Sequence, residues 1–304
     1  MHFFRTDMAV ESPAVVRRSQ KGIKVEERRE ENDIKITIVD ITDEAGEQAV
    51  GKPMGRYVTI ENQDIALGEP HTIHTAAQVF AKELSLLLGE KNNDDPYLVV
   101  GIGNRAVTAD SIGPLTAENI IVTRHLFGAM EEYLPARARS ACAIAPGVLG
   151  ETGMETGEVI KSIVDAINPN CIIAIDSLAA QSPQRVAASI QLSNTGIAPG
   201  SGLGNNRPRL DEGYLGVPVI AIGVPMVVYA SAIAYQAASA AMADDAIPQS
   251  IQERLMGLLD TDCGDMVVTP KDVDSIAENC AFLLSTGINM AIHHMDFQEA
   301  TNFA

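Results

Sequence analysis

Between residues 97 and 223 the sequence alternates short apolar runs with segments of helical periodicity, and this alternation constrains the fold more than any other feature. The apolar runs cover residues 97–102, 140–145, 171–175 and 217–223. Helices are predicted at about 114–129, 155–168 and, closing the chain, 271–293. Strands that are apolar throughout must be covered on both faces, so the pattern predicts an α/β fold with a mostly parallel sheet flanked by helices on both faces.

The first third of the chain predicts further elements. Residues 1–32 are polar and charged and are interpreted as an arm or an edge element. Residues 34–41 alternate apolar and polar side chains, which predicts a half-buried strand. Residues 71–90 carry the spacing of an amphipathic helix. We therefore expect extra N-terminal β or arm elements beside the parallel sheet.

Charge and hydropathy exclude some classes of partner. Forty acidic and 22 basic residues give a net charge of −18, a field that repels nucleic acid and anionic membranes. Residues 216–243 carry no charge, but Pro218, Pro225 and several polar residues interrupt them, so we interpret this segment as a buried strand followed by an Ala-rich helix. Four cysteines without C-x-x-C spacing, and a start without an apolar signal segment, predict a reduced, cytoplasmic protein without a membrane partner.

The loop after residues 97–102 begins like a dinucleotide-binding fingerprint, because Gly101, Gly103 and Ala106 fit G-x-G-x-x-A. The fingerprint also requires a helix that begins within it and a carboxylate at the end of the next strand. Pro114 interrupts any such helix, and the run at 140–145 ends in Pro-Gly. We therefore interpret the loop as a bend of the backbone around Asp110, and we expect no cofactor.

Asp110 and Asp176 are the candidate catalytic residues. Asp110 lies in this loop, and Asp176 follows the apolar run at 171–175 directly. Functional groups of parallel sheets gather beyond the carboxyl ends of the strands. Two neighbouring carboxylates can share a proton, so that one activates water as a base and the other serves as an acid. From spacing alone, the alternative that both residues cap turns or helices stays open.

Other chemistry-bearing residues form weaker patterns. His71 and His74 lack the Glu of an H-E-x-x-H motif, and His125 lies late in a predicted helix, where a cation suits the helix dipole. Glu118 and Glu158 could complete a metal site with the two aspartates, but their helical context is more typical of a solvated face. The glycine cluster Gly200–Gly204 follows no apolar strand and is interpreted as a flexible loop. We therefore expect no metal ligands.

Taken together, these segments resemble the germination proteases of spore-forming bacteria, which degrade small acid-soluble spore proteins. The resemblance covers nearly the whole chain. It lies in "RTDMAVE", "DIKITIVDIT", "VGIGNRAVTADSIGPLTAENIIVTRHLF", "IAPGVLGETGMETGEVI", "IIAIDSLAA", "IQLSNTGIAPGSGLGN", "GVPVIAIGVPMVV" and "MVVTPKDVDS". It implies a fold related to the hydrogenase-maturation proteases, a homotetramer, a location in the forespore or spore core, and an endopeptidase made as a zymogen that trims itself.

The resemblance also assigns residues. The two aspartates proposed as catalytic in the family correspond to Asp110 and Asp176, although neither lies in the Asp-Thr/Ser-Gly motif of pepsin-like enzymes. Family substrates are cut after an acidic residue in a stretch resembling Thr-Glu-Ile/Phe-Ala-Ser-Glu, and residues 6–11, Thr-Asp-Met-Ala-Val-Glu, repeat that pattern. The resemblance thus implies autocleavage between Asp7 and Met8. Residues 1–7 would be a propeptide that hinders access to the cleft of Asp110 and Asp176, and residues 8–304 a single peptidase domain.

Three alternatives stay open. The match at residues 6–11 could be a chance hexamer in a mobile arm. The chain could be a metal-assisted maturation peptidase or a nickel-binding, chaperone-like module on the same fold, which dependence on a divalent metal would favour. It could also be a catalytically silent spore protein, although retention of Asp110 and Asp176 weighs against that interpretation.

Overall fold

One mixed sheet organises the computed structural model, which describes residues 6–18, 21–89, 95–128, 130, 132, 134, 137–199, 208–241, 250 and 266–302. Within these residues the strands follow the order β1-β2-β3-β7-β8-β6-β4-β5, and a short β9 pairs with β8. Their bounds are β1 Ile23–Arg29, β2 Lys35–Ile41, β3 Gly55–Glu61, β4 Tyr97–Gly101, β5 Ala141–Ile144, β6 Cys171–Ala180, β7 Ser189–Ser193, β8 Val219–Tyr229 and β9 Val267–Val268.

The sheet has two halves of opposite character. Strands β5, β4, β6 and β8 are parallel, whereas β1, β2, β3 and β7 pair antiparallel, as do β7 and β8 where the halves meet. The α/β class is confirmed, and so is the expectation of N-terminal β elements, with β1 at the sheet edge. The expectation of a mostly parallel sheet holds for β5, β4, β6 and β8. The connection between β1 and β2, residues 30–34, is too short for the crossover that a parallel pair needs.

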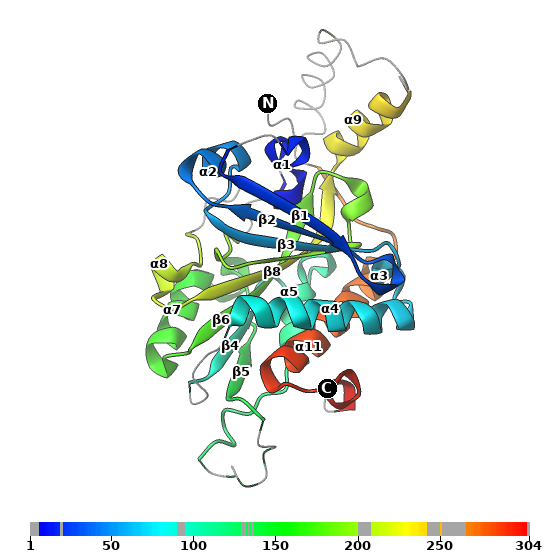
Figure 1. Cartoon of the computed structure of the whole chain (residues 1–304). Helices are drawn as coiled ribbons and strands as arrows, with labels where there is room; N and C mark the ends of the chain where they lie inside the picture. The colour runs from blue at the N-terminus through cyan, green and yellow to red at the C-terminus, as the bar shows by residue number, and fades with distance from the viewer. Residues whose placement is uncertain are drawn as a thin grey trace.

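Helices cover both faces, as expected. On one face α4 and α11 pack against each other and against apolar side chains from both halves of the sheet (Figure 1). On the other face α7 covers the parallel half, and η1, α1 and α2 cover the antiparallel half. The helices are η1 Ala9–Glu11, α1 Pro13–Arg17, η2 Glu31–Asp33, α2 Glu44–Val50, α3 Asp64–Leu67, α4 Pro70–Leu88, η3 Thr108–Asp110, α5 Ile112–Glu118, α6 Leu149–Thr152, α7 Thr156–Ile167, η5 Pro183–Arg185, α8 Glu212–Leu215, α9 Ala230–Ala241, α11 Val273–His293 and α12 Phe297–Asn302.

One predicted helix is wrong. The segment 114–129 forms a helix only as far as Glu118, where α5 ends. Beyond that residue, two buried side chains of α11 bond the backbone. Asn289 accepts the N–H of Ile121 at 2.9 Å and donates to the carbonyl of Asn119 at 3.1 Å, and His293 Nε2 lies 3.0 Å from the carbonyl oxygen of Ile121. These long-range bonds satisfy backbone groups that a longer helix would have paired internally.

The uncharged segment follows the interpretation given to it. Residues 219–229 form the buried strand β8, and the Ala-rich α9 follows it. No helix within the described residues is long and apolar enough to cross a bilayer.

Candidate active site

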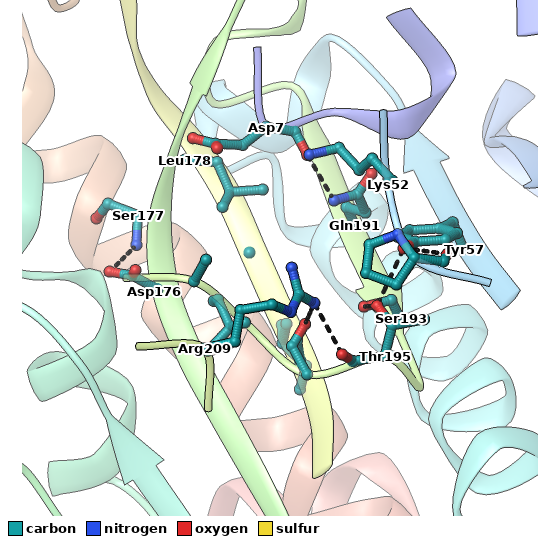
Figure 2. Close-up of a pocket in the computed structure, with 17 residues that line it drawn as sticks. Asp7, Lys52, Tyr57, Asp176, Ser177, Leu178, Gln191, Ser193, Thr195 and Arg209 are labelled. Atoms are coloured by element: carbon teal, nitrogen blue, oxygen red, sulfur yellow. Dashed lines mark hydrogen bonds between the residues drawn. The ribbon is translucent and has the colours of Figure 1, made fainter. Parts of the chain in front are cut away.

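A pocket lies where the two halves of the sheet meet, on the face that carries α7 and the N-terminal segment (Figure 2). It opens to solvent and is lined by Asp7, Lys52, Pro53, Tyr57, Asp176, Ser177, Leu178, Gln191, Ser193, Thr195, Gly196, Ile197, Ala198, Arg209, Ala221, Ile222 and Gly223. Three strands supply residues to its floor. Asp176 of β6 pairs with Gly223 of β8, which pairs with Gln191 of β7, so Asp176 and Gln191 project from the same face on either side of a glycine.

Gly223 and Leu178 fit closely at this junction. A Cβ on Gly223 would lie 2.4 Å from Cδ1 of Leu178, so any larger residue would displace the leucine. Leu178 in turn packs against Met8 and Val10 of the N-terminal segment. Because Gly223 has no side chain, Leu178 can lie against it, and Met8 packs against Leu178.

Asp176 is 5% exposed, and its Oδ1 accepts the N–H of Ser177 at 2.9 Å. Its predicted position at the end of a strand is wrong, because β6 continues to Ala180. The longer strand arises because β8 also extends, to Tyr229, and the two pair along most of their length. Asp176 therefore lies within a central strand, and the pairing of β6 with β8 fixes its backbone.

Asp110 ends η3 in the loop after β4. Its Oδ2 accepts the N–H of Asn104 at 2.8 Å. Gly103 has a φ of +123°, and a Cβ there would lie 2.0 Å from the carbonyl oxygen of Asp110. This geometry agrees with the interpretation that the loop bends around Asp110. The turn η3 packs against β6 and β8, although the residues that line the pocket include Asp176 and not Asp110.

The N-terminal segment forms one wall of the pocket through Asp7. Asp7 donates its N–H to the carbonyl of Ala179 and accepts the N–H of Ala179 on Oδ2, both at 2.9 Å. Met8 is 1% exposed and Ala9 is fully buried. Residues 8–11, interpreted from the sequence as part of an arm or an edge element, are therefore buried, because the side chains of Met8, Ala9 and Val10 pack on the sheet face.

Gln191 holds the peptide on both sides of the Asp7–Met8 bond. Its Nε2 donates to the carbonyl oxygen of Asp7 at 3.0 Å (Figure 2). Its Oε1 accepts the N–H of Ala9 at 2.7 Å. The predicted processing bond and the predicted catalytic Asp176 thus belong to one pocket. The carbonyl of that bond already accepts a hydrogen bond from a fixed amide.

Two cations line the same pocket. Burial lowers the pKa of the Lys52 ammonium, an effect that the nearby Asp7 carboxylate opposes. Arg209 donates from Nη2 to the carbonyl of Thr195 at 2.8 Å. Thr195 also donates to the hydroxyl of Tyr57, whose pKa burial raises. Sequence reasoning missed Lys52, Tyr57, Gln191 and Arg209, since no local motif marks them.

The weaker candidates lie elsewhere and do not line this pocket. His71 contacts the amide of Asn32, and the ring of His74 meets that of Phe297 edge-on with centroids 4.4 Å apart. Glu118 pairs with Arg105, whereas Glu158 and His125 are exposed.

Within the described residues no group of three His, Cys, Asp or Glu side chains is placed to hold a metal ion. Gly200–Gly204 lies outside the residues that the structure describes.

Comparisons with known proteins agree on one family. A profile described as germination protease matches residues 5–244. The germination protease of Clostridium perfringens strain ATCC 13124 is 42% identical over 313 residues, which cover 96% of each chain. That of Bacillus subtilis strain 168 is 37% identical over 352 residues, covering 98% of this chain and 95% of the relative. A solved [NiFe] hydrogenase maturation protease, HycI from Thermococcus kodakarensis, is 13% identical, with a TM-score of 0.36 over 68% of this chain and 98% of its own.

Proposed function

The chain belongs to the germination protease family, and from this premise we propose that it is a self-processing endopeptidase that starts the degradation of small acid-soluble spore proteins. Membership of the family makes it a hydrolase of peptide bonds that acts in spore germination. The proposal adds the substrate, a cut after an acidic residue and synthesis as a zymogen. It also divides the chain into a propeptide, residues 1–7, and one peptidase domain, residues 8–304.

One observation carries the proposal: the Asp7–Met8 bond lies in the pocket of Asp176, with its carbonyl bonded to Gln191. A chain that cuts itself must bring the bond to its own catalytic groups. The rest of the segment, Met8 to Glu11, is buried against the domain. Residues 1–7 would therefore block the pocket until they are released.

The proposed chemistry uses both candidate aspartates. Water adds through its oxygen to the carbonyl carbon of Asp7, one of the carboxylates of Asp110 and Asp176 takes a proton from that water, and the other protonates the leaving nitrogen of Met8. The carbon–nitrogen bond then breaks and leaves a carboxylate at Asp7 and an amine at Met8. Gln191 Nε2 donates to the oxygen on which negative charge develops, so this bond strengthens in the transition state.

Incubation of the purified full-length chain, followed by N-terminal sequencing, tests the zymogen. We expect Met8 as the new first residue and activity only after the cut. A cut elsewhere, or full activity with residues 1–7 in place, contradicts the proposal.

A second arm offers a small acid-soluble spore protein to the processed chain, with and without a chelator. We expect one discrete cut after an acidic residue, independent of chelator. Loss of the cut with chelator would favour the metal-assisted alternative instead.

Assembly and location belong to the same proposal. We propose a homotetramer in the forespore or spore core. Sedimentation at micromolar concentration tests the assembly, and a stable monomer contradicts it.

A further inference from the structure

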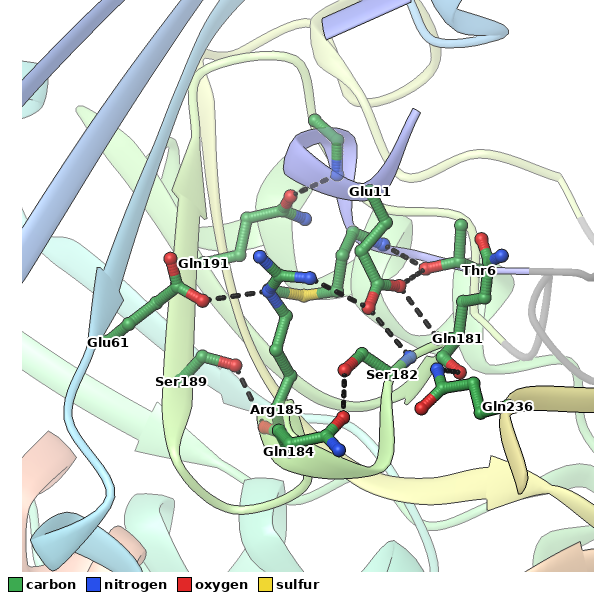
Figure 3. Close-up of polar contacts among 12 residues, drawn as sticks. Thr6, Glu11, Glu61, Gln181, Ser182, Gln184, Arg185, Ser189, Gln191 and Gln236 are labelled. Atoms are coloured by element: carbon green, nitrogen blue, oxygen red, sulfur yellow. Dashed lines mark hydrogen bonds and ion pairs between the residues drawn. The ribbon is translucent and has the colours of Figure 1, made fainter. Parts of the chain in front are cut away.

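Glu11 is an acidic side chain that is almost completely removed from water. The side chain is 3% exposed, and each of its oxygens accepts a backbone N–H (Figure 3). Gln181 donates to Oε2 at 2.7 Å and Ser182 donates to Oε1 at 2.8 Å. Arg185 Nη1 adds a third donor to Oε1 at 3.3 Å, and the Thr6 hydroxyl donates to Oε2. A buried carboxylate needs such partners, because its desolvation is costly.

The groups that bind the Glu11 carboxylate form a fixed site in the folded domain, here called the receptor. It consists of the backbone of Gln181 and Ser182 and the side chain of Arg185, all in the connection between β6 and β7. Arg185 is fixed from behind, because its Nε donates to Glu61 of β3 at 2.7 Å. Its carbonyl accepts the hydroxyl of Ser189 at 2.9 Å. The guanidinium therefore keeps its place without Glu11, and a receptor formed in advance binds with a smaller loss of entropy.

The hydrogen-bond partners of Glu11 described above are all donors. Two N–H groups, a guanidinium and a hydroxyl suit the two acceptor oxygens of a carboxylate. An amide of the same shape would turn an NH₂ group towards one of these donors. The receptor thus selects Glu over Gln by charge and by hydrogen-bond direction.

The receptor lies at a fixed spacing from the proposed cut. Gln191 bonds the carbonyl of Asp7 and the N–H of Ala9, and Glu11 is seated two residues further along. Between these positions, Met8 and Val10 pack against Leu178. One continuous surface therefore holds residues 6–11, with a carboxylate receptor four residues beyond Asp7.

We propose that the receptor of Gln181, Ser182 and Arg185 is the subsite for an acidic side chain four residues beyond the cut bond in protein substrates. This rests on the proposed function, in which Asp7–Met8 is the first bond cut. Cleavage turns the buried amide nitrogen of Met8 into a charged amine beside Leu178 and Val10. Burial of that charge is unfavourable, so residues 8–11 leave and the receptor becomes available to a separate chain.

Two peptides test the subsite. One carries residues 3–14 of this chain, and the other differs only by Gln in place of Glu11. With the processed protein we expect kcat/KM to be about 10- to 100-fold higher for the Glu peptide. The variant Arg185→Gln should lose most of this preference, Arg185→Lys should keep part of it, and Arg56→Gln should keep all of it because Arg56 pairs with Asp40 away from the pocket. Equal rates for both peptides with the unchanged protein overturn the proposal.

A binding measurement separates this inference from the proposed function. The full-length double variant Glu11→Gln, Asp176→Asn has a weakened internal occupant and one candidate catalytic group removed. Fluorescence anisotropy should give a Kd about tenfold or more lower for the labelled Glu peptide than for the Gln peptide. Preferential binding without cleavage by any processed protein would contradict the proposed function and support the receptor. Equal Kd values would overturn the receptor even if both peptides are cut, and thermal melting of each variant identifies those that fail to fold.

Discussion

The two halves of the sheet contribute different things to the pocket. The parallel half supplies Asp176 from within β6, and η3, which ends at Asp110, packs on that strand. The antiparallel half supplies Gln191 and Tyr57, and the connection between β2 and β3 supplies Lys52. The N-terminal segment lies across the junction, bonded to β6 through Ala179 and to β7 through Gln191.

The two halves of the sheet therefore have different roles in the pocket. A central strand with neighbours on both sides fixes a carboxylate firmly, whereas side chains and connections of the antiparallel half bind residues 6–11, of which Ala9–Glu11 form the turn η1. The two contributions meet because β7 pairs with β8 opposite Gly223. Substitutions in the parallel half and in the antiparallel half therefore test this difference separately.

Asp176→Asn should have the largest effect. Loss of a catalytic carboxylate costs about 10²- to 10⁴-fold in kcat, and Asp110→Asn should cost as much. Assays of the Glu peptide described above would measure this, with circular dichroism to confirm folding. Asp165→Asn is the matched control, because Asp165 is an exposed partner of Lys161 on α7. Full activity in either aspartate variant would show that the substituted aspartate is not catalytic.

Gln191→Leu tests whether the antiparallel half only binds. Because Nε2 donates to the carbonyl of Asp7, we expect kcat for the processing bond to fall by roughly 10²-fold. Ser193→Ala, on the same strand and in the same pocket, should change kcat by less than about threefold. A change confined to KM would mean that Gln191 holds the peptide and does not stabilise the transition state.

Gly223→Ala tests the junction itself. The added methyl group would meet Leu178, and overpacking of this kind costs about 1–3 kcal/mol in the free energy of unfolding. Gly157→Ala on α7 is the control, because the added carbon there finds contacts at 3.4 Å and a helix favours alanine. Urea denaturation of both variants measures the difference. Equal stabilities would show that Leu178 adjusts without cost.

His293→Gln should have the smallest effect. His293 lies on α11 and contacts the carbonyl oxygen of Ile121, in the segment that follows α5. Burial lowers the pKa of His293 below its ordinary 6.5, so the folded chain favours the neutral ring. Its contribution to stability is present above pH 6.5 and is lost as the pH falls towards the lowered pKa. We therefore expect the melting temperature to fall more steeply from pH 7.5 to pH 5.5, in the same buffers, for the unchanged chain than for His293→Gln.

The exposed His125 provides the control for this pH series. His125→Gln should leave the slope of melting temperature against pH unchanged. Parallel slopes for the unchanged chain and His293→Gln would contradict a buried neutral imidazole.

The two halves of the sheet also differ in how well the sequence predicts their contribution to the pocket. Apolar runs such as Cys171–Ile175 identify buried parallel strands locally, and the glycine-rich loop drew attention to Asp110. Gln191 reaches the pocket through the pairing of β7 with β8, and Tyr57 reaches it through the pairing of β3 with β7, whose residues are more than 100 positions apart. No short window of sequence contains that information. The helix predicted at 114–129 failed for the same reason, because Asn289 and His293 act from the far end of the chain.

Residues 8–11 remain joined to α1 through Ser12 after the Asp7–Met8 bond is cut. A ligand on so short a connection has an effective concentration of about millimolar at its own site. A separate protein with the same contacts must reach a comparable concentration to compete equally, unless the new amine at Met8 weakens the retained segment. The strength of that weakening would set a threshold of substrate abundance below which the cut enzyme stays largely idle.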